Sequence, residues 1–365
     1  MTNSPTPFAN SLTPSNAAPQ HGPRPLPLFL SILWQETEGD PAFRERAFAG
    51  LRRFQRAARP QHERPVKSVS AQGRAQLLHY EAMRQKSGRL PVLFVPSLIN
   101  APDVLDLSSD NSLLRFLTAE GHDIYQVDWG SPDKEDKGQN IADHVTDILL
   151  SLMATLPHPP IIVGYCLGGT IALAAASLAP CAALATIATP WHFNAYPDTF
   201  RNQTHQAWKV AEPVCRDLGV MPMEVLQQGF WSLDPHRTIE KYAAFAEMAE
   251  DDLGYDAFLL LEDWANEGAP LTLAAGQDLI ERFYGANIPG SGQWVVGGQS
   301  IDPAKLPCPT LAISSSTDKI VPAEACPSAD DQLMLHQGHV GMVVGRSAKE
   351  NLWKPLSTWL SAQGG

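Results

Sequence analysis

Short apolar runs alternate with segments of helical pattern through most of the chain. The runs are rich in Val, Ile and Leu, and they lie at 91–99, 123–129, 160–165, 183–189, 310–316 and 332–336. Runs of this length and composition are typical of strands that are buried on both faces. Helical segments occur near 110–120, 138–155, 168–179 and 346–361. The alternation predicts an α/β fold class with a mostly parallel sheet and helices on both faces.

The alternation stops between residues 198 and 290 and then resumes. This stretch has a helical pattern and is rich in Trp, Met and Phe. It separates two groups of predicted strands, so we expect it to be a helical lid inserted into the sheet domain. The domain itself would then consist of 74–197 and 291–365.

The first 73 residues show no strand pattern. Residues 1–25 are rich in Pro, Ser and Asn and are predicted to form a disordered tail. Residues 26–73 are predicted to form a helical extension, in which one helix begins at Asp40-Pro41. The apolar positions of this helix fall on one stripe, which consists of Phe43, Ala47, Phe48, Leu51 and Phe54. The stripe either packs on the main domain or forms a docking surface for a partner or a hydrophobic particle.

The composition narrows the classes of function. The formal net charge is −12 and no basic run with interleaved aromatics is present, so nucleic acid is not an expected partner. The five cysteines are widely spaced and form no C-x-x-C pair, which indicates neither a zinc site nor a disulfide framework. We therefore expect no metal, no bound cofactor and a reducing cytoplasm. We also expect no transmembrane segment and no signal peptide, because long apolar stretches and a basic N-terminal region are both missing.

A motif of the form G-x-C-x-G-G joins a predicted strand to an Ala-rich helix. Its residues are Gly164, Cys166, Gly168 and Gly169. A tight turn from strand to helix leaves no room for side chains at the glycine positions. The cysteine would lie at the N-terminus of the helix, where the helix dipole favours a thiolate. The N–H of Leu167 would donate to an oxyanion, so the motif predicts a nucleophile elbow that carries cysteine.

A thiol nucleophile needs a general base, and the base needs an acid that orients it. In folds with such an elbow, the chain order is nucleophile, acid, histidine. His339 follows the last predicted strand and is the expected base, with His336 as the weaker alternative. Asp318 follows the strand at 310–316 and is the expected acid, whereas Asp302 precedes that strand and is the weaker candidate.

A second oxyanion donor should come from the loop that follows the strand at 91–96. This loop reads Pro-Ser-Leu-Ile-Asn, and the backbone N–H of Leu98 or Ile99 is the predicted donor. Together with the elbow and the acid–base pair, this loop predicts an α/β-hydrolase fold with Cys166, His339 and Asp318 as its catalytic triad.

Around these residues the sequence resembles the polyhydroxyalkanoate (poly-3-hydroxybutyrate) synthases, over roughly residues 74–362. The segments that carry the resemblance are 96–100, 103–107, 125–133, 164–169, 296–298, 301–302, 307–309 and 338–341. The most specific part is the cysteine-containing motif combined with Asp-Trp-Gly-x-Pro-Asp, which occupies 128–133. In length the chain is similar to the short synthases, which work with a separate partner subunit.

The resemblance implies an acyltransferase that loads 3-hydroxyacyl groups from CoA thioesters onto Cys166. The acyl group would then pass to a hydroxyl and extend a polyester chain. The implied ligands are 3-hydroxyacyl-CoA and the polyester, and the implied partners are a second synthase subunit or granule proteins, with a homodimer left open. The implied location is the cytoplasm and the surface of polyester storage granules. The aromatic lid residues would exclude water, which competes for the acyl-enzyme; they are Phe230, Trp231, Phe245, Phe258, Trp264 and Phe283.

Two other functions use the same sequence features. A hydrolase of the same fold, such as an acyl-CoA thioesterase or a polyhydroxyalkanoate depolymerase, needs the same triad and differs in the access of water. An inactive homologue that binds polyester granules would keep the fold but would have an unreactive Cys166.

Overall fold

The computed structural model describes residues 22–60, 66–82 and 90–363. The chain forms two compact units. One combines Met1–Gln61 with His236–Leu260, and the other combines His62–Pro235 with Leu261–Gly365. The larger unit contains the sheet and every residue of the predicted site, while the described part of the smaller unit is helical.

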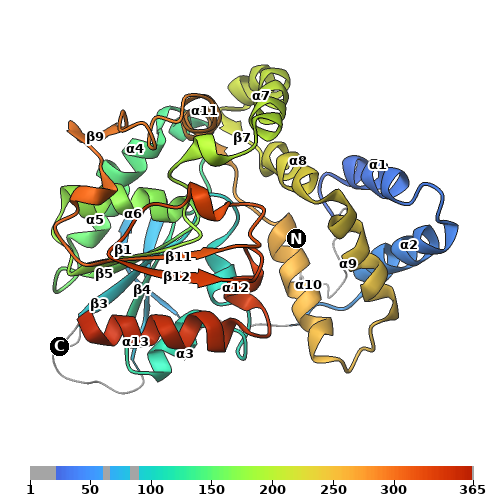
Figure 1. Ribbon diagram of the computed structural model, residues 1–365, viewed down its shortest axis with the longest axis horizontal. Helices are drawn as coiled ribbons and strands as arrows, with labels where there is room; N and C mark the ends of the chain where they lie inside the picture. The colour runs from blue at the N-terminus through green and yellow to red at the C-terminus, as the bar shows by residue number, and fades with distance from the viewer. Residues whose placement is uncertain (1–21, 61–65, 83–89, 364–365) are drawn as a thin grey trace, which may run out of the picture. The chain divides into compact units, whose positions relative to one another are not determined.

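An eight-stranded sheet forms the centre of the larger unit, in the order β1-β2-β4-β3-β5-β6-β11-β12 (Figure 1). The strands are β1 (Lys67–Gln72), β2 (Ala75–Tyr80), β3 (Pro91–Val95), β4 (Asp123–Asp128), β5 (Ile161–Tyr165), β6 (Ala183–Ile187), β11 (Thr310–Ser315) and β12 (Asp331–Leu335). Neighbouring strands from β4 to β12 run parallel, whereas β2 is antiparallel to both β1 and β4. The predicted mostly parallel sheet is confirmed.

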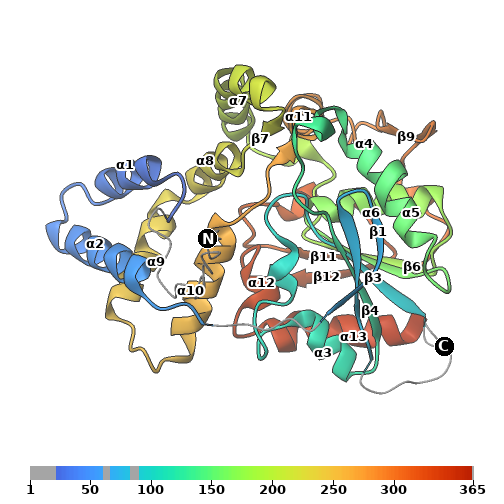
Figure 2. The same cartoon turned by 180° about the vertical axis from the view of Figure 1, so that it is seen from behind.

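Side chains of the central strands alternate between two hydrophobic cores. Leu93 and Val95 lie in one core and Val92 and Phe94 in the other, because successive residues of a strand point to opposite faces. The first core is covered by α4 (Ile141–Asp143), η3 (His144–Leu149), α5 (Leu150–Met153) and α6 (Leu167–Leu178). The second is covered by α3 (Leu113–Ala119), α12 (Gly341–Val344), η8 (Lys349–Trp353) and α13 (Lys354–Gln363), as Figure 2 shows from behind. Burial on both faces explains why these strands read as continuous apolar runs.

The sheet begins earlier in the chain than predicted. β1 and β2 form an antiparallel hairpin at its edge, so the helical extension cannot reach residue 73. β1 has the sequence KSVSAQ, is exposed at every position except Ser70, and is interrupted by a bulge between Ser68 and Ser70. An exposed edge strand does not need alternating apolar residues. The sequence of β1 therefore lacks the pattern from which a strand is predicted.

The stretch predicted to be one lid, 198–290, lies between β6 and β11 and is divided between the two compact units. The larger unit contains α7 (Asp198–Leu218), β7 (Val220–Met221), α8 (Met223–Leu233), β8 (Leu271–Thr272), α11 (Leu273–Gln277) and η5 (Asp278–Gly285). The smaller unit contains α9 (Pro235–Glu247, from His236) and α10 (Leu253–Asn266) as far as Leu260. Phe245 and Phe258 therefore belong to a different unit from the predicted site.

In the smaller unit, α1 (Leu26–Glu36) and α2 (Pro41–Arg56) pack with α9 and α10. The ring of Tyr242 lies 4.8 Å from that of Phe29 and 5.6 Å from that of Phe54, between ring centroids. Arg53 donates hydrogen bonds to the carbonyls of Phe245 and Ala246, both at 3.0 Å. Most of the apolar stripe of α2 is thus buried within the smaller unit, where Phe54 packs on the ring of Tyr242.

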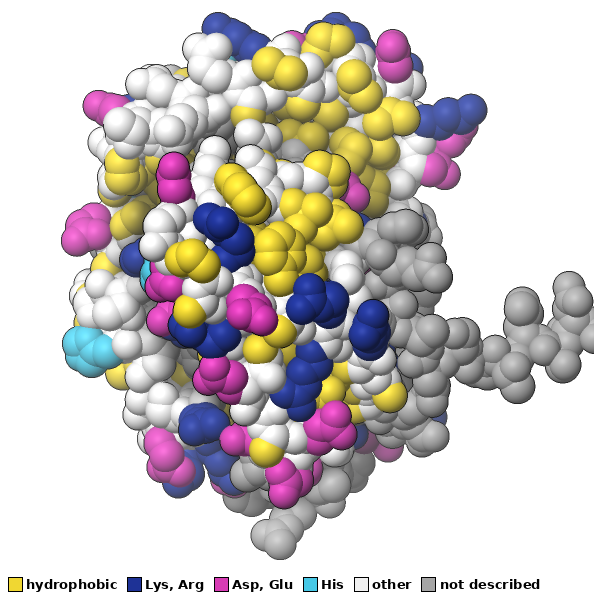
Figure 3. Space-filling model, turned by 90° about the vertical axis from the view of Figure 1, so that its right-hand side faces the viewer, with side chains coloured by type: hydrophobic (Ala, Val, Ile, Leu, Met, Phe, Trp, Pro, Cys, Tyr) yellow, Lys and Arg dark blue, Asp and Glu magenta, His cyan; other side chains and the backbone are white. Residues whose placement is uncertain are grey.

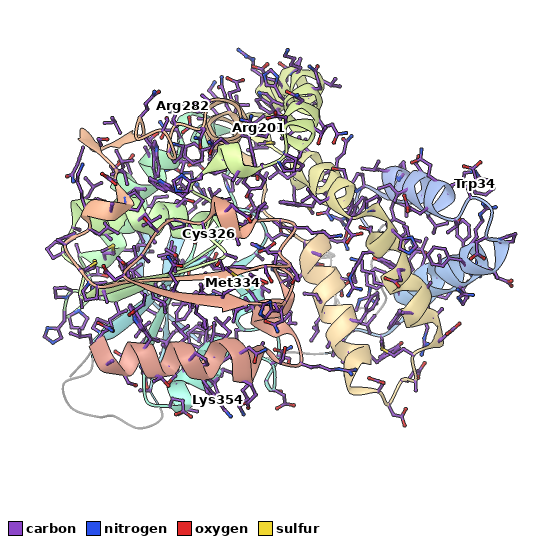
Figure 4. All side chains as sticks on the ribbon, in the orientation of Figure 1. Trp34, Arg201, Arg282, Cys326, Met334 and Lys354 are labelled. Atoms are coloured by element: carbon purple, nitrogen blue, oxygen red, sulfur yellow. The ribbon has the colours of Figure 1, made fainter. Side chains whose placement is uncertain are left out.

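The surface of the described residues carries charges of both signs. On the face shown in Figure 3, basic and acidic side chains are interspersed with hydrophobic ones. Trp34 is 59% exposed on α1 (Figure 4), and the guanidinium of Arg44 lies 4.1 Å from its ring centroid. Among the described residues, no helix combines the length and the apolar character needed to cross a bilayer. Residues 1–21 lie outside the described residues, so the disordered tail remains a prediction there.

Candidate active site

Cys166 lies in the sharp turn between β5 and α6. Its backbone has φ 54° and ψ −131°, a conformation that residues other than glycine rarely adopt. Its N–H donates to Ile187 O, and its carbonyl accepts from the N–H of Gly169, both at 2.9 Å. Strain of this kind is retained where surrounding contacts enforce it, and it is a feature of nucleophile elbows. The predicted turn geometry around Cys166 is therefore present.

The glycines of the motif lie where the backbone approaches other groups closely. A Cβ atom at Gly168 would overlap the carbonyl oxygens of Val95 and Pro96, and one at Gly169 would overlap the Thr189 side chain. A Cβ atom at Gly164 would collide with the backbone of Gly169. The close approach at Gly168 also shows that the loop after β3 lies against the first turn of α6.

The Gly168→Ala substitution is expected to destabilise the protein by about 1–3 kcal/mol, because the new methyl group must displace backbone oxygens. Thermal unfolding followed by circular dichroism measures the effect. Gly138→Ala is the control, since a Cβ atom at Gly138 meets no atom within 4 Å. Equal melting temperatures for the two variants would show that the elbow tolerates a side chain at Gly168.

Asp318 and His339 come together at the carboxyl ends of β11 and β12. Nδ1 of His339 lies 2.7 Å from Oδ2 of Asp318, and both residues are buried. The other carboxylate oxygen, Oδ1, accepts from the N–H groups of Ile320 at 2.8 Å and Val321 at 2.9 Å. Adjacent parallel strands end at the same edge of a sheet, which brings together two loops that are separate in the sequence. The hydrogen bonds fix the carboxylate, and the carboxylate fixes the orientation of the imidazole.

Two opposing effects determine the charge of His339. Burial lowers the pKa of its imidazole, but the charges of Asp318 and Cys166 and hydrogen bonds to both side chains raise it to about 10. The imidazole is therefore expected to be protonated at neutral pH. The arrangement supports a protonated imidazole that Asp318 holds in a fixed orientation near Cys166.

Cys166 is expected to react with iodoacetamide at pH 7 at least tenfold faster than Cys326, and peptide mass mapping measures both rates. Burial raises the pKa of Cys326, which lies in the loop after β11 (Figure 4), to about 12. The His339→Gln variant serves as control, because loss of the cation should reduce the advantage of Cys166. Equal labelling of the two cysteines would contradict activation of Cys166 by His339 and would favour the inactive homologue.

Three tyrosines near the triad were not predicted as site residues. The ring of Tyr165 stacks on that of His339 with centroids 5.3 Å apart, and its hydroxyl donates to His339 O at 3.3 Å. Burial raises the pKa of Tyr196 and of Tyr284, and the charge of Cys166 adds to both increases. Tyr165 directly precedes the nucleophile and could have been noticed there. Tyr196 and Tyr284 come from distant segments, which no local pattern connects.

The two predicted oxyanion donors from the β3 loop differ in their hydrogen bonds. The N–H of Ile99 already donates to Ser97 Oγ at 3.0 Å, which weighs against this residue. Leu98 is buried in the same loop, and no acceptor for its N–H is found among the described residues. Leu167 is the first residue of α6, so its N–H has no partner within the helix. Leu167 and Leu98 remain the predicted pair.

The weaker candidates for the base and the acid, His336 and Asp302, do not contact Asp318 or His339 in the hydrogen bonds that the structure describes. His336 is exposed, and its Nδ1 lies 2.7 Å from Ser316 Oγ. Asp302 caps the short helix η6 (Pro303–Lys305) and pairs with Lys305 at 2.9 Å. The thiol of Cys181 donates to the sulfur of Cys308 at 3.3 Å, near the opposite ends of β6 and β11 from the triad. Within the described part of the chain, no three His, Cys, Asp or Glu side chains gather as metal ligands.

Comparison with known proteins gives matches along most of the chain. Residues 92–343 match the alpha/beta hydrolase family, and residues 65–117 match the N-terminus of poly-beta-hydroxybutyrate polymerase (PhaC). The poly(3-hydroxyalkanoate) polymerase subunit PhaC of Haloferax mediterranei is 28% identical over 313 residues, which cover 81% of this chain and 64% of that protein. The subunit of the same name from Allochromatium vinosum is 27% identical over 315 residues, which cover 81% of this chain and 88% of that protein.

These matches confirm the resemblance to the polyhydroxyalkanoate synthases, although the chain spans less than two thirds of the Haloferax relative. The structure of MenH from S. aureus superposes with a TM-score of 0.51 at 14% identity, covering 79% of this chain and 99% of that one. This likeness shows a common fold and confirms the predicted fold class. Because the first family match covers more than half of the chain, the protein belongs to the alpha/beta hydrolase family.

Proposed function

We propose that this protein is a polyester synthase that transfers 3-hydroxyacyl groups from CoA thioesters to Cys166 and then to a hydroxyl. The observation that carries the proposal is a cysteine at a strained elbow, beside an imidazole that is oriented by a buried carboxylate. The names of the relatives support the polymerase reaction over other reactions of the fold.

In the first step, the thiolate of Cys166 attacks the thioester carbonyl of 3-hydroxyacyl-CoA. The N–H groups of Leu167 and Leu98 would stabilise the oxyanion of the tetrahedral intermediate. The carbon–sulfur bond to CoA breaks, and the leaving thiolate takes the proton from His339. The acyl group remains a thioester, so its activation is retained.

Acylation prepares His339 for the second step. The negative charge of Cys166 is one cause of the raised pKa of His339, and this charge disappears when the sulfur is acylated. The imidazole then becomes neutral more readily and can act as a general base. It takes the proton of a 3-hydroxyl group while the hydroxyl oxygen attacks the acyl-Cys166. An ester bond forms, the Cys166 thiolate leaves, and His339 is again protonated beside it.

Polymerisation requires that the hydroxyl reaches the acyl-enzyme before water does. Tyr196 and Phe193 are buried, and their rings contact Tyr284 at centroid distances of 5.0 and 5.1 Å. These rings and Tyr165 provide an apolar surrounding for the thioester. We propose that this cluster contributes to the exclusion of water.

A second synthase subunit is the partner that we propose. The relatives are named as subunits, and the resemblance to the short synthases also points to a two-subunit enzyme. The proposed location is the cytoplasm, at the surface of polyester storage granules.

Incubation with 3-hydroxybutyryl-CoA tests the proposed function. Released CoA, free 3-hydroxybutyrate and polymer are measured in the same reaction, and the Cys166→Ala variant serves as the blank. We expect CoA release with most of the acyl groups recovered as polymer. Recovery as the free acid would assign the protein to the thioesterases, and no release above the blank would support an inactive homologue.

A further inference from the structure

A groove of about 600 Å³ lies between α7, α8 and η5 in the larger unit. Apolar side chains from these helices line it, among them Phe200, Val225, Leu226 and Ile280. The groove has no role in the two chemical steps described above.

The inner end of the groove lies beside the candidate active site. Tyr284 and Ile99 both line it. Ile99 follows the predicted oxyanion donor Leu98 in the loop that lies against the first turn of α6. Tyr284, Ile99 and Cys166 all pack against the same hydrophobic core. A molecule attached to Cys166 could therefore extend into the groove past Tyr284 and Ile99.

The chemistry of the groove matches a polyester better than CoA. None of its lining residues is Asp, Glu, Lys, Arg or His, and four of them carry side-chain amides: Asn202, Gln203, Gln206 and Gln228. A polyester of 3-hydroxyacids repeats aliphatic carbons and ester carbonyls, so it offers apolar surface and hydrogen-bond acceptors without charge. The amides can donate to those carbonyls. The phosphates of CoA would find no cation among the lining residues.

An exposed apolar stripe continues outward from the groove along α7. Val210 lines the groove and is 81% exposed, and Val214 and Leu218 are 60% and 50% exposed. Residues four apart lie on the same face of a helix, so these three side chains form a row about 12 Å long. α7 is labelled at the top of Figure 1.

We infer that the groove and this stripe bind the growing polyester chain and lead it from Cys166 to the surface. This inference rests on the proposed polymerase function. It assigns a binding site for the product, because the groove reaches Ile99 in the loop of the predicted oxyanion donor, lacks ionisable side chains other than Tyr284, and continues into exposed apolar surface. A chain held there would stay in register for the next transfer, and longer products would result.

The test compares Val210→Asp and Val214→Asp with wild type. Both side chains are exposed, so folding should be unaffected, and Val295→Asp on β9 (Val295–Val296) is the matched control at 52% exposure. Acylation is measured as CoA released in the first turnover from 3-hydroxybutyryl-CoA, and product length is measured by size-exclusion chromatography. We expect the Val210→Asp substitution to lower both mean polymer mass and acylation rate relative to wild type. The fold reduction in polymer mass should be at least five times the fold reduction in acylation rate. The control should match wild type in both measurements.

Three results would overturn the inference. The first is polymer of wild-type length from both the Val210→Asp and the Val214→Asp variants. The second is an equal loss of acylation rate and of polymer mass. The third is a change in oligomeric state, measured by light scattering. The last result would show a protein interface. If wild type makes no polymer, the proposed function fails. Binding of a 3-hydroxybutyrate tetramer methyl ester to the Cys166→Ala protein then tests whether the groove is a polyester site. Binding that Val210→Asp weakens at least tenfold supports the groove as a polyester site, and unchanged or absent binding overturns it.

Discussion

The Cys166→Ser substitution is expected to abolish polymer formation from 3-hydroxybutyryl-CoA, with incorporation of radiolabelled substrate falling at least 1,000-fold. A serine hydroxyl is far harder to deprotonate than a thiol with an ordinary pKa of about 8.5, so His339 would activate it much less readily. Any acyl group that reached the serine would also rest on an oxygen ester. Attack by a neutral secondary hydroxyl on that ester lacks the driving force of a thioester.

After incubation with substrate, the Cys166→Ser protein is expected either to carry a stable acyl-serine ester or to be unmodified. Intact-protein mass spectrometry distinguishes the two states. Cys181→Ser is the control, because Cys181 is half-buried near the opposite end of β6 from the triad. Polymer yields from Cys166→Ser within a few-fold of wild type would defeat the thioester argument. Such a result would remove the main reason for preferring polymerisation over hydrolysis.

The Asp318→Asn substitution is expected to lower kcat for CoA release by about 1,000-fold, by analogy with the loss of the orienting acid in other triads. The variant loses the charge that raises the pKa of His339, and the amide no longer selects the productive tautomer. Because Asp318 also accepts two backbone N–H groups, folding must be measured separately.

The pH dependence of stability provides that measurement. The folded protein keeps a proton on His339 up to about pH 10, whereas the unfolded chain releases it near its ordinary pKa of about 6.5. This contribution to stability is therefore complete below pH 6.5 and decreases as the pH rises towards 10, by at most about 1.4 kcal/mol per pH unit. We expect the stability difference between wild type and Asp318→Asn in urea to be larger at pH 6 than at pH 9.

Asp302→Asn is the control for this experiment, since Asp302 forms an ion pair with the well-exposed Lys305 and caps only a short helix. Its stability difference from wild type should be small at both pH values. A difference for Asp318→Asn that stays constant or grows towards pH 9 would contradict a protonated His339 in the folded protein.

Local sequence patterns were sufficient to predict the sheet and the nucleophile elbow. The strands β3, β5 and β6 are buried on both faces, so each appears in the sequence as an uninterrupted apolar run. The elbow is contiguous in sequence, from Gly164 to Gly169, and its glycines are required by backbone contacts within the turn and with its neighbours. The pairing of Asp318 with His339 followed from chain order, because loops after adjacent parallel strands meet at one edge.

The sequence by itself therefore determined the fold class, the strained turn at Cys166 and the pairing of Asp318 with His339, since each depends on short-range pattern or on a rule of topology. Only the tertiary structure decided that α2 packs with α9, that β1 extends the sheet, and that Tyr196 and Tyr284 lie near Cys166. These contacts join segments far apart in the chain. They depend on which apolar surfaces meet during folding, and that choice leaves no periodic signal in either segment alone.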